Sequence, residues 1–166
     1  MGELNFFLGL QIKQNPNGTM IYQQKYAIEL IKKFKMYESK EIDTPIAIAT
    51  KLDIDKTGSS VDQKLYRGMI GALLYLTASR HNIVFNVGCC AHFQDNPEES
   101  HLTAVKKILR YLKGTTDLCL WYPKSSNFNL VGYVDADNAG FLVDRKSTSG
   151  TAQFLGSCLV TWATTK

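Results

Sequence analysis

The chain opens with a strand–turn–strand pattern that passes directly into a helical one. Strand-forming residues run through 6–13, residues 15–18 read NPNG, and strand character resumes at Thr19. An Asn-Gly pair between two such runs favours a tight turn, so we predict a β-hairpin. Apolar residues then recur at helical spacing, which predicts an amphipathic helix. They are Tyr26, Leu30, Ile31 and Phe34.

The periodicity fades in residues 41–63, which contain Pro45, Gly58 and a serine pair. This pattern predicts a long connection that runs over the protein surface. Structureless stretches of this length are uncommon inside compact domains. We therefore expect the chain to be one part of a larger assembly.

Two strongly apolar helices are predicted within residues 66–80 and 82–93. Their periodic positions are Met69, Ile70, Leu73, Leu74 and Thr77 in the first, and Ile83, Val84, Val87 and Ala91 in the second. Helices this apolar should be largely buried.

A third helix is marked at both ends. Asn96 is a favourable N-cap, Pro97 suits the first helical position, and Glu98 and Glu99 favour the positive end of the dipole. Gly114 is the expected end of the helix. One face carries Leu102, Val105, Leu109 and Leu112.

The other face of this helix is basic. Lys106, Arg110 and Lys113 follow one another at helical spacing, Lys107 lies nearby, and residues 101–116 contain no acid. Such a stripe can follow a phosphate backbone. It can equally be a solvated helix face whose bases lie near the negative C-terminal end. The pattern leaves both interpretations open.

Strand periodicity returns at the end of the chain, in residues 128–135, 151–156 and 157–164. Three short strands joined by tight turns predict an antiparallel meander. We expect no helix to cover this sheet, which leaves an apolar face without a partner and indicates a domain that is cut short.

Two aspartates, Asp135 and Asp137, follow the first of these strands. They are either part of a metal site or turn residues whose side chains bond to the backbone.

The amino-acid composition is typical of a globular protein and does not indicate a particular function. The 166 residues suit a single globular domain, with 45% hydrophobic and 20% charged residues. No apolar run is long enough to cross a membrane, and we expect an intracellular protein of the cytoplasm or the nucleus. The net charge of +4 is compatible with a polyanionic partner. The four cysteines show no C-x-x-C spacing, so no structural zinc is expected.

Several strings, in fixed order from end to end, carry a family resemblance. They are MGELNFFLGLQI, QQKYAIELIKKF, LYRGMIGALLYLTASR, AVKKILRYLKGT, GYVDADNAG, DRKSTSG and FLGSCLVTW. Together they resemble the polymerase polyprotein of copia-type retrotransposons, particularly those of plants. The family commonly has proline after the TASR string. His81 stands there in this chain and would permit an unbroken helical connection to the next helix.

The resemblance implies a mixed α+β chain in four parts. Residues 1–40 correspond to the last palm hairpin and following helix of a reverse transcriptase, and 41–63 to a linker. Residues 64–122 correspond to a helical thumb or connection. Residues 123–166 correspond to the first three antiparallel strands of a truncated ribonuclease H-like fold.

The resemblance also limits the chemistry that we expect. The family's polymerase site ends in an Asp-Asp turn upstream of the MGEL string, and this chain contains no Asp-Asp pair. Two-metal polymerisation needs such carboxylates, so the chain should not polymerise by itself. Gly2 and Glu3 match the region that contacts the primer terminus.

Asp135 matches the family's first catalytic aspartate of ribonuclease H, which binds Mg²⁺ in the intact enzyme. The partner glutamate should lie beyond Lys166, so we expect at most a weak, incomplete metal site and no stably bound Mg²⁺.

We therefore expect a fragment of a Pol polyprotein that is inactive alone and whose ancestral role was to hold a primer–template or an RNA–DNA hybrid. Its partners would be nucleic acid and the remainder of the polyprotein, with no membrane. One alternative is a residual nucleic-acid-binding module that uses Lys106, Lys107, Arg110 and Lys113. Another is a partial ribonuclease H completed by a second chain.

Overall fold

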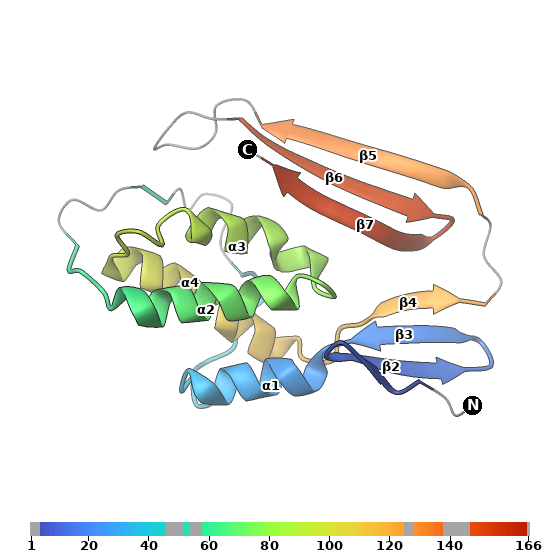
Figure 1. Ribbon diagram of the computed structural model, residues 1–166, viewed down its shortest axis with the longest axis horizontal. Coiled ribbons are helices and arrows are strands. Elements are labelled where there is room, and N and C mark those ends of the chain that lie inside the picture. Colours follow the sequence, from blue (N-terminus) through green and yellow to red (C-terminus); the bar gives the residue numbers. More distant parts are fainter. Residues whose placement is uncertain (1–3, 46–51, 54–57, 125–127, 138–146, 166) are drawn as a thin grey trace.

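The computed structural model describes residues 4–45, 52–53, 58–124, 128–137 and 147–165. A body of helices lies beside two antiparallel sheets, as Figure 1 shows. The strands are β1 (Phe6–Phe7), β2 (Leu10–Asn15), β3 (Gly18–Tyr22), β4 (Leu120–Pro123), β5 (Leu130–Asp137), β6 (Thr148–Leu155) and β7 (Cys158–Thr165). The helices are α1 (Gln24–Lys33), α2 (Gln63–Leu76), α3 (Val84–Ala91) and α4 (Glu99–Gly114). The expected mixed α+β composition is confirmed.

The predicted hairpin is present as β2 and β3. Asn15 closes its turn, because its side-chain oxygen accepts hydrogen bonds from the backbone N–H groups of Asn17 (3.1 Å) and Gly18 (3.0 Å). Asparagine favours turns for this reason. The short strand β1 extends the sheet on one side.

Strand β4 extends the same sheet on the other side and was not predicted. It pairs with β3, with Met20 opposite Trp121 and Thr19 opposite Tyr122. Gly18 permits this pairing, because a Cβ atom there would collide with the Tyr122 carbonyl oxygen. The expected domain boundary between residues 122 and 123 falls inside β4. This strand therefore returns the chain to its N-terminal hairpin after the helices.

The core lies between the four helices. All four apolar positions expected on the face of α4 are buried, and Ile108 joins them. They pack in one cluster with Leu30 and Ile31 of α1, Ile70 and Leu73 of α2, and Val87 of α3. The apolar faces of the four helices thus pack against one another.

Helix α4 begins at Glu99, with Glu98 as its N-cap, so the expected start at Asn96 is wrong. Residues 97–99 instead pair with an extended segment. The Val61 N–H bonds to the Pro97 carbonyl (3.1 Å) and the Glu99 N–H bonds to the Ser59 carbonyl (3.1 Å). His101 completes a capping box by accepting a hydrogen bond from the Glu98 N–H at 3.1 Å.

The connection from α2 to α3 is interrupted, so the expected unbroken helix is wrong. Helix α2 ends at Leu76, the chain turns, and a short 3-10 helix (His81–Ile83) precedes α3. The side chain of Arg80 turns inward at this break and is only 3% exposed. Its bonds to Thr115, described below, anchor the turn.

Strands β5, β6 and β7 form the expected antiparallel meander in that order. The expectation that no helix covers this sheet is wrong for one face, because α3 contacts β7. The Trp162 indole N–H donates to the Thr77 carbonyl at 3.1 Å and ties the sheet to the end of α2. On the opposite face of β5, Leu130 and Val134 are 70% and 75% exposed.

No helix within the described ranges is both long and apolar enough to cross a membrane.

Two adjacent leucines of α2 provide a matched test of the core. Leu73 is fully buried and Leu74 is 47% exposed. Leu73→Ala should lower the free energy of unfolding by about 2–5 kcal/mol, because it removes buried methyl groups and leaves a cavity. Leu74→Ala should change it by about 0.5 kcal/mol or less. Urea denaturation followed by circular dichroism measures both, and equal losses would contradict this arrangement of the core.

Candidate functional site

Asp135 lies near the end of β5, opposite Gly150 of β6, which in turn pairs with Thr164 of β7. Because alternate residues of a strand share a face, Asp135 lies on the same face as Tyr133. The partners Ala152 and Trp162 extend that face across the sheet toward α3. Asp135 is exposed and makes no hydrogen bond or ion pair with the residues that the structure describes.

This position does not form a metal centre from the described residues. Among them, no group of three or more His, Cys, Asp or Glu side chains is gathered where it could hold a metal ion. Mg²⁺ prefers six oxygen ligands in octahedral geometry, and a single carboxylate meets that requirement poorly. Asp137, the other candidate aspartate, is the last residue of β5, and its side chain lies outside what the structure describes. The described residues by themselves therefore do not supply the oxygen ligands that Mg²⁺ requires here.

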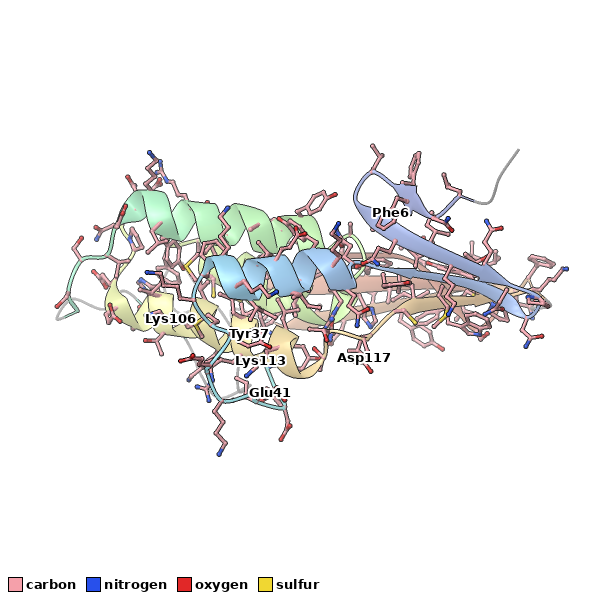
Figure 2. All side chains as sticks on the ribbon, turned by 90° about the horizontal axis from the view of Figure 1, so that it is seen from below. Phe6, Tyr37, Glu41, Lys106, Lys113 and Asp117 are labelled. Carbon is pink, nitrogen blue, oxygen red and sulfur yellow. The ribbon has the colours of Figure 1, made fainter. Side chains whose placement is uncertain are left out.

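The four predicted basic residues of α4 divide into two pairs. Arg110 donates from Nε to the Lys40 carbonyl at 2.6 Å, and Lys113 donates from Nζ to the Ser39 carbonyl at 2.9 Å. Lys113 also lies 3.8 Å from a Glu41 carboxylate oxygen and 5.9 Å from the centre of the Tyr37 ring. Figure 2 shows Lys113, Tyr37 and Glu41 gathered beside α4. This pair holds the segment that follows α1.

Lys106 and Lys107 form the other pair. Both are half-buried, and neither makes a hydrogen bond or an ion pair within the described part of the chain. Long lysine side chains can cover apolar surface while keeping the ammonium group in water. These two lysines are therefore the members of the stripe most available to an external anion.

The predicted primer-contacting residues, Gly2 and Glu3, lie outside the described residues. Strand β1, which follows them in the chain, presents Phe6 and Phe7 to solvent. The Tyr75 hydroxyl holds this end of the chain by donating to the Leu8 carbonyl at 2.6 Å.

Arg80 is a buried charged residue that sequence reasoning missed. It donates from Nη1 to the Thr115 carbonyl and from Nη2 to the Thr115 hydroxyl, both at 2.6 Å. Its guanidinium lies 6.0 Å from the centre of the Tyr111 ring. Burial lowers the pKa of Arg80, and nearby Tyr111 and Asp117 oppose that shift. No local pattern marks its burial, because the residue that accepts its two shortest hydrogen bonds, Thr115, lies 35 residues away in the sequence.

A groove of about 480 Å³ separates α3 from the face of the second sheet that carries Asp135. Its walls are aromatic: the rings of His81 and Trp162 meet edge-on at 5.9 Å, and those of Tyr133 and Phe154 at 5.7 Å. Burial lowers the pKa of His81, and the charge of Arg80 lowers it further.

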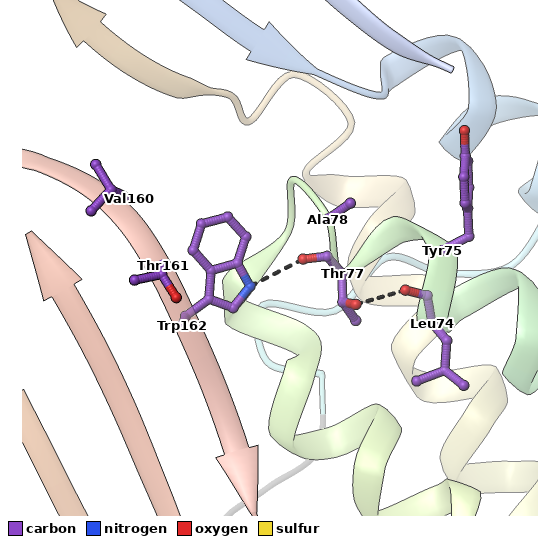
Figure 3. Close-up of a pocket in the computed structure, with 7 residues that line it drawn as sticks. All are labelled: Leu74, Tyr75, Thr77, Ala78, Val160, Thr161 and Trp162. Atoms are coloured by element: carbon purple, nitrogen blue, oxygen red, sulfur yellow. Dashed lines mark hydrogen bonds between the residues drawn. The ribbon is translucent and has the colours of Figure 1, made fainter. Parts of the chain in front are cut away.

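Trp162 also lines a second, open hollow, which Figure 3 shows in close-up. The hollow lies between β7 and the end of α2, where Thr77 and Leu74 stand opposite Trp162. Within it the Thr77 hydroxyl donates to the Leu74 carbonyl at 2.6 Å.

Two arginine substitutions compare the contribution to stability of a buried charged side chain with that of an exposed ion pair. Arg80→Ala should lower the free energy of unfolding by about 2–4 kcal/mol, because the Thr115 carbonyl loses a charged donor inside the protein. Arg67→Ala should cost less than about 1 kcal/mol. Its ion pair with Asp95 (2.9 Å) is open to solvent, with side chains 50% and 99% exposed. Denaturation at low and high salt measures both, and a smaller loss for Arg80→Ala than for Arg67→Ala would contradict the anchoring role.

The chain was compared with known proteins. It is 36% identical to the retrovirus-related Pol polyprotein from transposon RE1 of Arabidopsis thaliana over 99% of its own length. It is 33% identical to the corresponding polyprotein from transposon TNT 1-94 of Nicotiana tabacum over 98% of its length. The chain spans only 11% and 13% of those two polyproteins.

It also covers 68% of an uncharacterized mitochondrial protein of Arabidopsis thaliana at 32% identity. No family model and no solved structure matches the chain. The expected resemblance is confirmed, since the match extends over nearly the whole chain. The chain belongs to the family of retrovirus-related Pol polyproteins of copia-type transposons.

Proposed function

We propose that this chain is the segment of a retrotransposon Pol polyprotein that follows the polymerase active site and holds a primer–template or an RNA–DNA hybrid. The observation that carries the proposal is the match to Pol polyproteins along 99% of the chain. Such proteins act on nucleic acid as the resemblance implies, and this segment lacks an Asp-Asp pair. Its part in that work is to bind, not to catalyse.

The basic face of α4 supports a nucleic-acid contact. Lys106 and Lys107 project from a helix that has no acidic residue after Glu99, and the chain carries a net charge of +4. Arg110 and Lys113 contribute indirectly, since their bonds to the backbone of residues 39 and 40 keep the neighbouring segment in place. The phosphate contacts are therefore assigned to Lys106 and Lys107 first.

The second sheet supports the assignment of residues 123–166 to the start of a ribonuclease H-like domain. Strand β5 stands at the edge of its sheet and pairs only with β6 among the described strands. Exposed apolar residues such as Leu130 and Val134 on an open edge strand are a liability that proteins usually cover. In the longer polyprotein, a further element packed on this face of β5 would cover them. Asp135 alone supplies too few oxygens for two-metal chemistry.

A double charge reversal tests the binding proposal. Lys106→Glu with Lys107→Glu should weaken binding of a labelled RNA–DNA hybrid by roughly tenfold or more, because two phosphate contacts become repulsive. Wild-type affinity should fall by roughly tenfold between about 50 mM and about 200 mM salt, as two released counterions require. Fluorescence anisotropy measures both.

The matched control is Lys13→Glu with Lys64→Glu. These two exposed lysines lie on β2 and α2, and the change in net charge is the same. Equal weakening by the two double variants would reject a localised interface. An affinity that does not depend on salt would reject phosphate recognition altogether.

The open edge of β5 favours a second candidate, a partial ribonuclease H that another chain completes. Mixing this chain with the polyprotein segment that follows it should then produce Mg²⁺-dependent hybrid cleavage. Asp135→Asn should abolish that cleavage, and Asp43→Asn, at an exposed site near the end of the segment after α1, should not. Absence of cleavage by the mixture of folded segments would reject this candidate.

A further inference from the structure

We propose that the groove between α3 and the second sheet binds the guanidinium group of an arginine side chain. Asp135 is the anionic partner, and the aromatic rings form the walls. The site is defined by His81, Phe85, Tyr133, Asp135, Phe154 and Trp162. The inference does not rest on the proposed function, because it uses neither the basic face of α4 nor a metal.

The walls of the groove are held in place before any ligand arrives. Trp162 is fixed by the bond from its indole N–H to the Thr77 carbonyl and by the edge of His81. Tyr133 and Phe154 support each other in the same edge-on way. Phe85 stands on α3 with 53% of its surface exposed, so its ring is accessible from solvent. Rings that are already ordered lose little entropy when a flat ligand group stacks on them.

The carboxylate of Asp135 stands beside open space. Its cross-strand neighbour is Gly150, and a Cβ atom built there would meet no atom of the described residues within 4 Å. A side chain at that position would occupy the room next to the carboxylate. Among the described residues that line this groove, Asp135 is the one carboxylate, and it makes no ion pair with any described residue. It is therefore ready to accept an external donor.

The electrostatics of the groove favour a cation. Aromatic rings carry negative charge on their faces, which attracts a cation placed over them. The lowered pKa of His81 keeps its imidazole neutral at neutral pH, so it does not offset the charge of Asp135. Arg80 is committed to Thr115 and does not supply the missing counter-charge.

Among cations, the groove selects guanidinium. Mg²⁺ retains its water and needs several oxygens, whereas the walls here offer carbon surface. A lysine ammonium is compact and strongly hydrated, so it gains less from aromatic walls. Guanidinium is planar and weakly hydrated, stacks on rings, and can bond to one carboxylate through two parallel N–H groups. One carboxylate among several rings is the environment that these properties suit.

Small probes test the assignment directly. Nα-acetyl-arginine amide should shift the NMR signal of the Trp162 indole N–H and bind in the low millimolar range. Nα-acetyl-citrulline amide has nearly the same shape without the charge, and it should bind at least about fivefold more weakly. Nα-acetyl-lysine amide should also bind more weakly than the arginine probe.

Three variants locate the probe. Asp135→Asn and Phe85→Ala should each weaken binding of the arginine probe by about threefold or more, because one removes the carboxylate and the other a wall. Both residues are exposed, so the fold should survive, and the spectrum of each variant verifies this. Asp43→Asn, which removes an exposed carboxylate elsewhere, should leave the affinity unchanged.

Equal binding of the citrulline or lysine probe would overturn the proposal. So would an Asp135→Asn variant that binds as tightly as the wild type. The Lys106→Glu, Lys107→Glu double variant should bind the arginine probe normally. Loss of hybrid binding and loss of probe binding are therefore separate results.

Discussion

The burial of one face of α4 is the constraint on which the rest of the structure depends. Val105, Ile108, Leu109 and Leu112 have no exposed surface, and each contacts a core that α1, α2 and α3 share. Burying a side chain of this size contributes about 1.5–3 kcal/mol, so rotating the helix would be very costly. The same rotation fixes where its lysines point. The nucleic-acid face proposed here is the solvent side of a helix whose orientation the core decides.

Both ends of α4 also carry the connections that join distant parts of the chain. At its start, the capping box of Glu98 and His101 follows an extended pairing with residues 59–61. At its end, Thr115 accepts two hydrogen bonds from Arg80, which lies at the break between α2 and α3. Strand β4 then pairs with β3 and returns the chain to the N-terminal hairpin. A helix that is capped and tied at both ends thus connects the helical core to the first sheet.

Asp135 illustrates how a residue's role depends on its surroundings. In the family that this chain belongs to, the resemblance assigns it to a metal site built from several carboxylates. In the described part of this chain, the groove beside it is lined by rings, and a glycine is its cross-strand neighbour. A hard divalent ion and a soft organic cation place opposite demands on such a site. The neighbours favour the organic cation.

The sequence by itself determined the local elements and the family. Hydrophobic periodicity located α1, α2, α3 and the buried face of α4, because a side chain's place on a helix follows from spacing alone. Turn residues located the first hairpin and the final meander for the same local reason. The Pol strings identified the family without any structure.

Tertiary structure alone decided what depends on residues far apart in the chain. It placed β4 beside β3, moved the start of α4 to Glu99 with Glu98 as its N-cap, and buried Arg80 against Thr115. It also divided the basic stripe, since Arg110 and Lys113 bond to a backbone about 70 residues away. Helical spacing shows which residues share a face, but the partner across that face is set by packing between segments that no local window contains.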